Sequence, residues 1–173
     1  MGELDGWVAC PRCRSDLERG EGRVSCPTCG FVAYGASKPT ASALCVDDAG
    51  RVMLARRAVE PRKGCWDAPG GFLDEGEHPL DGVRRELREE SGLEIEPGEF
   101  LGVFMDRYGG DSTAESTLNL YWLARVGGGE PEPGDDVAEL RWFAADELPP
   151  RDDIAFASVA EALSAWRARD EHA

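Results

Sequence analysis

Three glutamates in one short segment are the residues of this 173-residue chain best suited to do chemistry. At about 100° per residue on a helix, Glu86, Glu89 and Glu90 fall within an arc of roughly 100°. Like charges one helical turn apart repel each other and destabilise the helix. A cation held between them would offset that repulsion, and Mg²⁺ and Mn²⁺ prefer oxygen ligands such as these carboxylates. The spacing therefore predicts a site for a divalent metal ion on one face of a helix.

The residues around the glutamates predict how that helix is held. The arc beside the carboxylates is apolar and is expected to pack on a core; it consists of Leu80, Val83 and Leu87. Pro79 suits the first turn of the helix, and Gly92 suits its end. Ahead of the helix, Gly70 and Gly71 form a turn whose backbone can approach a metal-bound phosphate closely, because glycine carries no side chain.

Residues 71 to 93 also match a longer pattern, Gly-x5-Glu-x7-Arg-Glu-U-x-Glu-Glu-x-Gly-U, in which U is apolar. This pattern is the signature of the Nudix hydrolases, which the chain resembles over roughly residues 38 to 170. A complete match argues against the alternative interpretation, a solvated acidic helix face. The matching positions are Gly71, Glu77, Arg85, Glu86, Leu87, Glu89, Glu90, Gly92 and Leu93.

The resemblance implies an α/β fold, the Nudix α/β/α sandwich with a mixed β-sheet. Strands interleaved with two main helices agree with it. It also implies hydrolysis of a nucleoside diphosphate linked to another moiety, with a divalent metal ion and a water nucleophile. ADP-ribose, another nucleotide sugar or a related nucleotide is the expected substrate, and nucleoside monophosphate is the expected product. A non-catalytic nucleotide-sensing or interaction module that keeps the fold is the alternative.

Roles for the site residues follow from the same resemblance. Mg²⁺ or Mn²⁺ is expected on Glu86, Glu89 and Glu90, with the carbonyl of Gly70 as a further ligand. Arg85 is expected to clamp a carboxylate such as that of Glu77 or Glu89, and Glu77 to support the metal ligands. The general base is expected to be a glutamate of the motif or an acid outside it. The sequence does not choose among the outside candidates, Asp111, Glu115, Asp136 and Glu139.

Substrate contacts are expected from the residues around the glycine turn. Arg56 and Arg57 end a strand that points towards this turn, and strand alternation predicts that one of the two faces inward. Gly71 can lie against a phosphate, and Phe72 and Tyr108 can either stack on a base or pack within a loop. Zinc-ribbon relatives that cleave NADH typically carry a Ser-Gln-Pro-Trp-Pro-Phe-Pro type of motif. Residues 94–120 contain nothing like it, which weakens NAD(H) as the substrate.

The front of the chain carries two Cys-x-x-Cys pairs separated by 12 residues. Four thiolates from two tight turns complete a tetrahedral site, and the segment between the pairs suggests a short hairpin. The whole resembles a zinc ribbon that holds structural Zn²⁺, and it could also serve in dimerisation or at the substrate rim. Two disulfides are the competing interpretation, which a cytosolic chain disfavours. The four residues are Cys10, Cys13, Cys26 and Cys29.

The net charge and the distribution of apolar residues limit which partners and which domain organisation are expected. A formal net charge of -15 argues against a nucleic acid as the main partner, because such binders need clustered Lys and Arg. The N-terminus does not resemble a signal peptide and no apolar stretch approaches a membrane span, so we expect a cytoplasmic protein without a membrane partner. The expected division is a zinc ribbon and linker at 1–37 and a Nudix domain at 38–173.

Patterning along the rest of the chain predicts the remaining elements. Strands at 40–46 and 51–57 are expected to form a hairpin through Asp47–Gly50. A short turn of helix is expected at 146–150, and an amphipathic helix at 154–169. The acidic and glycine-rich segment 127–136 is expected to be a mobile loop. Further strands are expected at 66–68, 100–106, 117–126 and 140–143.

Overall fold

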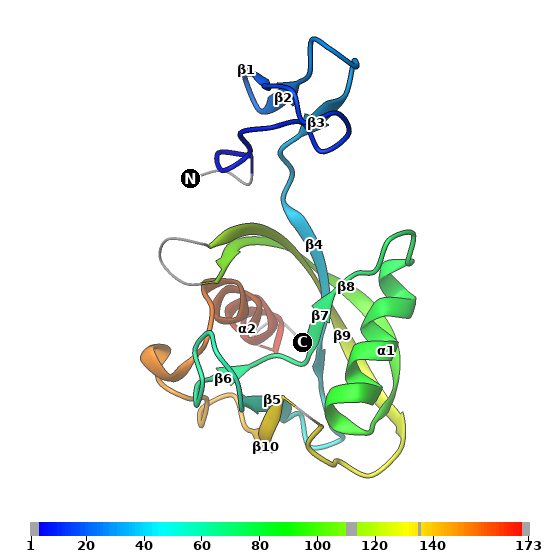
Figure 1. Cartoon of the computed structure of the whole chain (residues 1–173). Coiled ribbons are helices and arrows are strands. Elements are labelled where there is room, and N and C mark those ends of the chain that lie inside the picture. Colours follow the sequence, from blue (N-terminus) through cyan, green and yellow to red (C-terminus); the bar gives the residue numbers. More distant parts are fainter. Residues whose placement is uncertain (1–3, 110–113, 135, 171–173) are drawn as a thin grey trace. The chain divides into compact units, whose positions relative to one another are not determined.

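The computed structural model describes residues 4–109, 114–134 and 136–170. The chain divides into two compact units (Figure 1). The small unit comprises Met1–Lys38 and Arg107–Ser116, and the large unit comprises Pro39–Asp106 and Thr117–Ala173. In the part of the chain that the structure describes, no helix has the length and apolar character needed to cross a membrane.

The small unit is a three-stranded antiparallel sheet in the order β1-β2-β3. The predicted hairpin is confirmed: β1 and β2 pair on either side of a tight turn in which Gly22 takes a φ of +63°. Arg19 holds the preceding segment by donating to the carbonyls of Leu4, Asp5 and Trp7. The strands are β1 (Glu18–Gly20), β2 (Arg23–Ser25) and β3 (Val32–Tyr34).

The large unit contains two sheets, two α-helices and a short 3₁₀ helix. One sheet has the strand order β7-β4-β9-β8, and the other has the order β10-β5-β6. The elements are β4 (Lys38–Cys45), β5 (Val52–Arg57), β6 (Trp66–Asp67), β7 (Gly70–Phe72), α1 (Pro79–Ser91), β8 (Glu94–Tyr108), β9 (Glu115–Gly128), β10 (Val137–Phe143), η1 (Arg151–Asp153) and α2 (Ala157–Asp170).

The four-stranded sheet is mixed, as the resemblance implies. Strand β7 runs antiparallel to β4, with Ala41 opposite Gly71. Strands β4 and β9 run in the same direction: the Thr40 hydroxyl donates to the Asn119 side chain, and further along, the Val46 amide donates to the Ala124 carbonyl.

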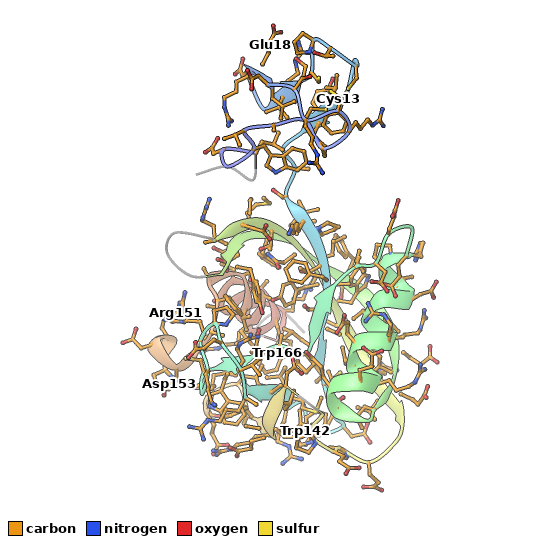
Figure 2. All side chains as sticks on the ribbon, in the orientation of Figure 1. Cys13, Glu18, Trp142, Arg151, Asp153 and Trp166 are labelled. Atoms are coloured by element: carbon orange, nitrogen blue, oxygen red, sulfur yellow. The ribbon has the colours of Figure 1, made fainter. Side chains whose placement is uncertain are left out.

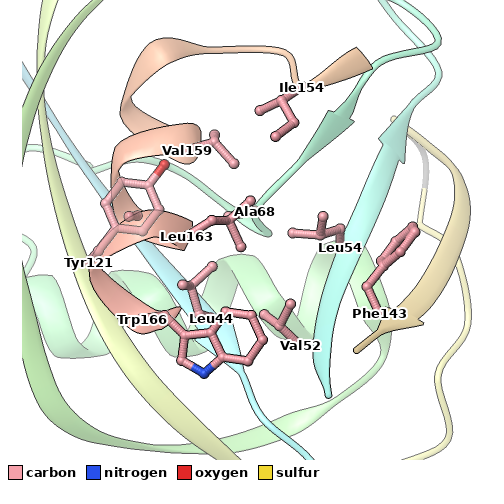
Figure 3. Packing of buried hydrophobic residues seen from close by; sticks show 11 residues of the cluster. Leu44, Val52, Leu54, Ala68, Tyr121, Phe143, Ile154, Val159, Leu163 and Trp166 are labelled. Carbon is pink, nitrogen blue, oxygen red and sulfur yellow. The ribbon is translucent and has the colours of Figure 1, made fainter. Parts of the chain in front are cut away.

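Alternating side chains of β4 and β5 bury two separate apolar layers, one under each helix. On one side, Ala41, Ala43 and Met53 pack with the α1 residues Val83 and Leu87. The opposite layer joins both strands to α2, and its labelled members interlock in Figure 3. It includes Leu44, Val52, Leu54, Tyr121, Val159, Leu163 and Trp166. Helices α1 and α2 therefore cover opposite faces of the strands (Figure 1), and the α/β/α sandwich is confirmed.

Two local predictions were wrong. The turn after β4 forms, but its strands separate after one bridge between Val46 and Val52 and enter different sheets. The reason is that β4 is already paired on both edges, by β7 and β9. The predicted helical turn at 146–150 forms instead at Arg151–Asp153. Pro149 and Pro150 lack amide donors and disfavour helix before them, so the turn can begin only after them.

Candidate active site

Helix α1 is fixed at both ends and along one flank. At its start, the His78 imidazole accepts a hydrogen bond from the Leu80 amide at 3.2 Å. At its end, Gly92 is left-handed, with a φ of +68°, and its amide donates to the Arg88 carbonyl at 3.0 Å. Because Leu87 is completely buried, the rotation of the helix is set, and the predicted span and caps are confirmed.

Gly70 and Gly71, which were expected to form a turn, lie in strand β7, and neither position has room for a side chain. Gly70 has a φ of +147°, and a Cβ atom there would overlap the carbonyl oxygen of Ala41. A Cβ atom on Gly71 would lie 2.6 Å from the carboxyl carbon of Glu86. The amide of Gly70 donates to the Glu90 carboxylate at 2.9 Å. The two glycines therefore bring the backbone directly against two acidic residues of the helix.

Arg85 ties together the other acids of the motif. Its guanidinium binds both oxygens of Glu77, with two donor–acceptor distances of 2.9 Å. It also donates to Glu86 at 2.7 Å and to Glu89 at 3.2 Å, and it reaches the Phe72 carbonyl at 3.2 Å. These bonds from Arg85, with one from the Asp74 amide, hold the pKa of Glu77 down at about 2. Arg85 is thus positioned to orient carboxylates.

Replacing Arg85 by alanine is expected to lower kcat by about 10–100-fold with little change in KM, because the residue orients ligands without touching substrate. Arg85→Lys is expected to recover only part of the loss, since an ammonium group cannot make the two-pronged contact with Glu77. Steady-state kinetics with kcat and KM measured separately would check this. A rise in KM at unchanged kcat would contradict it and make Arg85 a substrate ligand.

Four carboxylates act on one another around Glu90. Partial burial raises the pKa of Glu90 well above its ordinary value, and the nearby charges of Asp136, Asp67 and Glu86 raise it further. Burial likewise raises the pKa of Glu86, with smaller contributions from Glu89 and Asp136. Desolvated like charges are costly for the folded protein unless a cation accompanies them. Hard oxygen donors in this state fit a divalent metal ion.

Asp136 reaches this cluster because the segment before it lies on the end of α1. The amide of Gly134 donates to the Glu90 carbonyl at 2.8 Å, and the amide of Glu132 donates to the Ser91 carbonyl at 2.9 Å. A Cβ atom on Gly134 would overlap the carbonyl oxygen of Glu89, so the backbone of Gly134 lies directly against the helix. Two residues of the segment that was expected to be a mobile loop, Glu132 and Gly134, are therefore hydrogen-bonded to the end of the helix, close to Asp136 in the sequence.

The four cysteines of the small unit come together as the spacing predicts. Their sulfur atoms all lie within 4.8 Å of one another, and all four are free thiols. The distances from Cys10 to Cys29 and from Cys13 to Cys26 are 3.6 and 3.4 Å. Tetrahedral zinc with bonds of about 2.3 Å places its sulfurs about 3.8 Å apart, so the group can hold a metal ion. Cys13 is labelled in this unit in Figure 2.

Each cysteine pair sits on the same kind of turn. The Cys10 carbonyl accepts from the Arg14 amide at 2.8 Å, and the Cys26 carbonyl accepts from the Gly30 amide at 3.0 Å. Arg14 and Gly30 are both left-handed, with φ values of +63° and +73°. Gly30 takes this conformation without strain, whereas at Arg14 the repeated turn imposes it on a residue with a side chain.

Comparison with known proteins identifies the family. The profile of the NUDIX domain matches residues 36–163. The chain belongs to the Nudix family. A crystal structure of a Nudix hydrolase from Nitrosomonas europaea superposes with a TM-score of 0.77 at 26% identity, covering 95% of this chain and 92% of that one.

Two curated relatives of the chain are named for different activities. An ADP-ribose pyrophosphatase of Methanocaldococcus jannaschii is 35% identical over 101 residues, which are 57% of this chain and 57% of the relative. The NAD-capped RNA hydrolase NudC of Stutzerimonas stutzeri is 28% identical over 155 residues, which are 85% of this chain and 53% of the relative. The chain therefore spans little more than half the length of these relatives.

The three glutamates of the Nudix motif have different partners in the structure. In the part of the chain that the structure describes, the cysteine group alone brings three or more metal-ligating atoms within 4.8 Å. Glu86 and Glu89 lie on Arg85, and the Glu89 side chain is 60% exposed. Glu90 instead faces the glycine turn. The contact of Arg85 with Glu89 was predicted from the sequence, whereas its contact with Glu86 and the hydrogen bond from Gly70 to Glu90 were not.

The outside acids fall in different places. Asp136 lies with Glu86 and Glu90, whereas Glu139 on β10 is paired with Arg56 at 3.6 Å. Glu115 belongs to the small unit and is paired there with Lys38. Asp111 lies outside the described residues.

The predicted substrate contacts are also separated by their surroundings. Arg56 is half exposed and donates to the Gly64 carbonyl at 3.0 Å. Arg57 is the inward-facing member of the pair, and its side chain is 12% exposed. Phe72 is the second residue of the Nudix motif and is 37% exposed, and Tyr108 belongs to the small unit.

Asp67 is a site residue that sequence reasoning missed. It lies on β6, is paired with Arg57 at 2.9 Å, and acts on the charge of Glu90. Burial raises its pKa to about 6 against the opposing effect of Arg57. Its signal in the sequence was its place two residues before Pro69 in a strand that leads into the glycine turn.

Proposed function

We propose that this chain is a metal-dependent pyrophosphohydrolase that cleaves a nucleoside diphosphate linked to another moiety and releases nucleoside monophosphate. The observation that carries the proposal is the group of desolvated acids around Glu90, to which the helix, the glycine turn and Asp136 contribute. A structural helix face has no need of such a costly arrangement.

In this proposal Glu86 and Glu90 hold Mg²⁺ or Mn²⁺, with Glu89 and the carbonyl of Gly70 as further ligands. When bound, the metal ion would neutralise charge on the phosphoryl oxygens and lower the pKa of a coordinated water. Arg85 and Glu77 orient the carboxylates, and Gly71 lets the substrate phosphates approach the backbone.

Asp136 is our proposed general base or additional ligand outside the motif. Of the described outside candidates, it is the one whose charge acts on Glu86 and Glu90. A carboxylate in that place can accept a proton from a water lying between it and the substrate.

The substrate class is proposed from the family and the charge of the chain. The names of the relatives divide between ADP-ribose and NAD-linked substrates. The net charge of -15 and the missing proline-rich motif both favour a small nucleotide such as ADP-ribose over NAD-capped RNA. We retain the cytoplasm as the proposed location.

We further propose that residues 1–37 form a structural zinc module and residues 38–173 the catalytic domain. The cysteine sulfurs support zinc over the hard metals of the other site, because thiolates are soft ligands.

The test is hydrolysis of a panel containing ADP-ribose, nucleotide sugars, nucleoside triphosphates, NADH and a NAD-capped RNA. Purified protein with millimolar Mg²⁺ or Mn²⁺ is expected to release nucleoside monophosphate from ADP-ribose or a nucleotide sugar. Tight binding of a panel member without hydrolysis under either metal ion would favour the alternative, a non-catalytic nucleotide sensor. Preferential decapping of the RNA would overturn the proposed substrate class.

A further inference from the structure

Arg57 and Asp67 form a largely buried ion pair beside the proposed site. The Arg57 guanidinium donates to Asp67 at 2.9 Å, and the two side chains are 12% and 17% exposed. Arg57 also donates through Nε to the Pro61 carbonyl at 2.8 Å, and its guanidinium lies over the Phe156 ring, 5.2 Å from the centroid. A hydrogen bond, an ion pair and a stacking contact thus fix the plane and direction of this side chain.

Asp67 connects this pair to the glycine turn. Its second carboxylate oxygen accepts from the Ala68 amide at 2.9 Å, so both oxygens are engaged. Three residues further on, the Gly70 amide donates to Glu90. Because Asp67 is only three residues before Gly70, a displacement of Asp67 would be expected to move the Gly70 amide and so disturb its hydrogen bond to Glu90.

Arg57, Asp67, Glu90 and Asp136 line one small cavity. The other residues described around it are Ala55, Ala68 and Val137, so Arg57 is the one cation among the residues that line it. A fixed positive charge at this place offsets one of three negative charges, and the remaining charge is available to a metal ion.

We propose that Arg57 is a positioning residue that acts through Asp67, and that it does not bind substrate phosphate. This inference rests on the proposed hydrolase function and deepens it. A phosphate-binding arginine must present its donors to the ligand, whereas the Arg57 guanidinium is enclosed and directed at protein acceptors. The pair fixes the glycine turn, and with it the carboxylate of Glu90.

The test compares Arg57→Gln, Asp67→Asn and the double variant. Each single variant is expected to lower kcat by about 10–100-fold with KM within twofold of wild type, as for residues that orient metal ligands. The kcat of the double variant is expected to be no lower than that of the less active single variant, because the two residues act as one unit. A large rise in KM confined to Arg57→Gln, adding to the effect of Asp67→Asn, would overturn the proposal and make Arg57 a phosphate ligand.

Mn²⁺ binding followed by electron paramagnetic resonance supplies a readout that needs no substrate. Asp67→Asn leaves Arg57 uncompensated beside the acids and is expected to weaken Mn²⁺ binding about tenfold. The double variant removes both charges and is expected to bind Mn²⁺ more tightly than Asp67→Asn. Unchanged binding in Asp67→Asn would overturn the proposal. If wild type hydrolyses no panel member but this pattern holds, the proposed function fails and the positioning role stands.

The exposed pair of Arg51 and Asp47, 2.7 Å apart in the turn after β4, is the matched control. Arg51→Gln and Asp47→Asn are expected to leave kcat, KM and Mn²⁺ binding within twofold of wild type. Should a single variant of the Arg57 pair fail to fold, recovery of folding in the double variant would support the coupling, and failure of the double variant as well would count against it.

Discussion

Glu90→Gln is expected to lower kcat about a thousandfold and, at the same time, to make the metal-free protein more stable. The glutamine oxygen can still accept from the Gly70 amide, so the fold of the turn is retained. The activity falls because a charged ligand of the proposed metal ion is lost. Steady-state kinetics with the best panel substrate would measure it.

The expected gain in stability follows from the raised pKa of Glu90. When folding raises the pKa of an acid, the free energy of unfolding falls as the pH rises from the ordinary pKa towards the raised one. At pH 7 the folded protein is therefore destabilised by Glu90. Glutamine carries no charge and does not cause this destabilisation. We expect the melting temperature in magnesium-free buffer to rise by roughly 2–4 °C, the shift that corresponds to about 1 kcal/mol in a protein of this size.

Glu94→Gln is the matched control for that variant. Glu94 is an exposed acid just past the same helix, and its pKa is lowered by its hydrogen bonds and ion pair with Arg88. Its removal is expected to leave kcat unchanged and to lower the melting temperature slightly, the opposite sign to Glu90→Gln. A Glu90→Gln variant that keeps a tenth or more of wild-type kcat would contradict the assignment of the metal site.

Removal of zinc is expected to unfold the small unit and leave the large unit folded. Structural zinc in such modules contributes apparent binding free energies of about 10–16 kcal/mol, far more than this unit's small apolar core can replace. The two apolar layers of the large unit contain no residue of the small one. Hydrogen exchange after treatment of the protein with a zinc chelator should therefore show loss of amide protection in the small unit, with protection retained in the large unit.

Elemental analysis provides the control for the zinc prediction. One equivalent of zinc is expected in wild type and in Cys65→Ser, because Cys65 lies outside the cysteine group. Cys26→Ser is expected to lose the metal together with the fold of the small unit. Zinc-free protein whose small unit keeps its amide protection would contradict a structural role for the metal.

The sequence by itself determined the features that depend on neighbours along the chain. The span of α1, its caps and its buried face follow from the helical period together with Pro79 and Gly92. The cysteine group follows from the spacing of its pairs, because each pair needs only one tight turn. These features depend only on residues close together in the sequence, so they can be predicted without knowing how distant segments pack.

The tertiary structure alone decided which charged residues from distant segments meet. Asp67 and Arg57 became partners because β6 pairs with β5, and Asp136 acts on Glu90 because the nearby residues Glu132 and Gly134 lie on the end of α1. The separation of β4 and β5 into two sheets likewise depends on strands distant in the sequence. Pairing between distant segments is set by the packing of the whole unit, and the spacing of residues within one segment does not predict it.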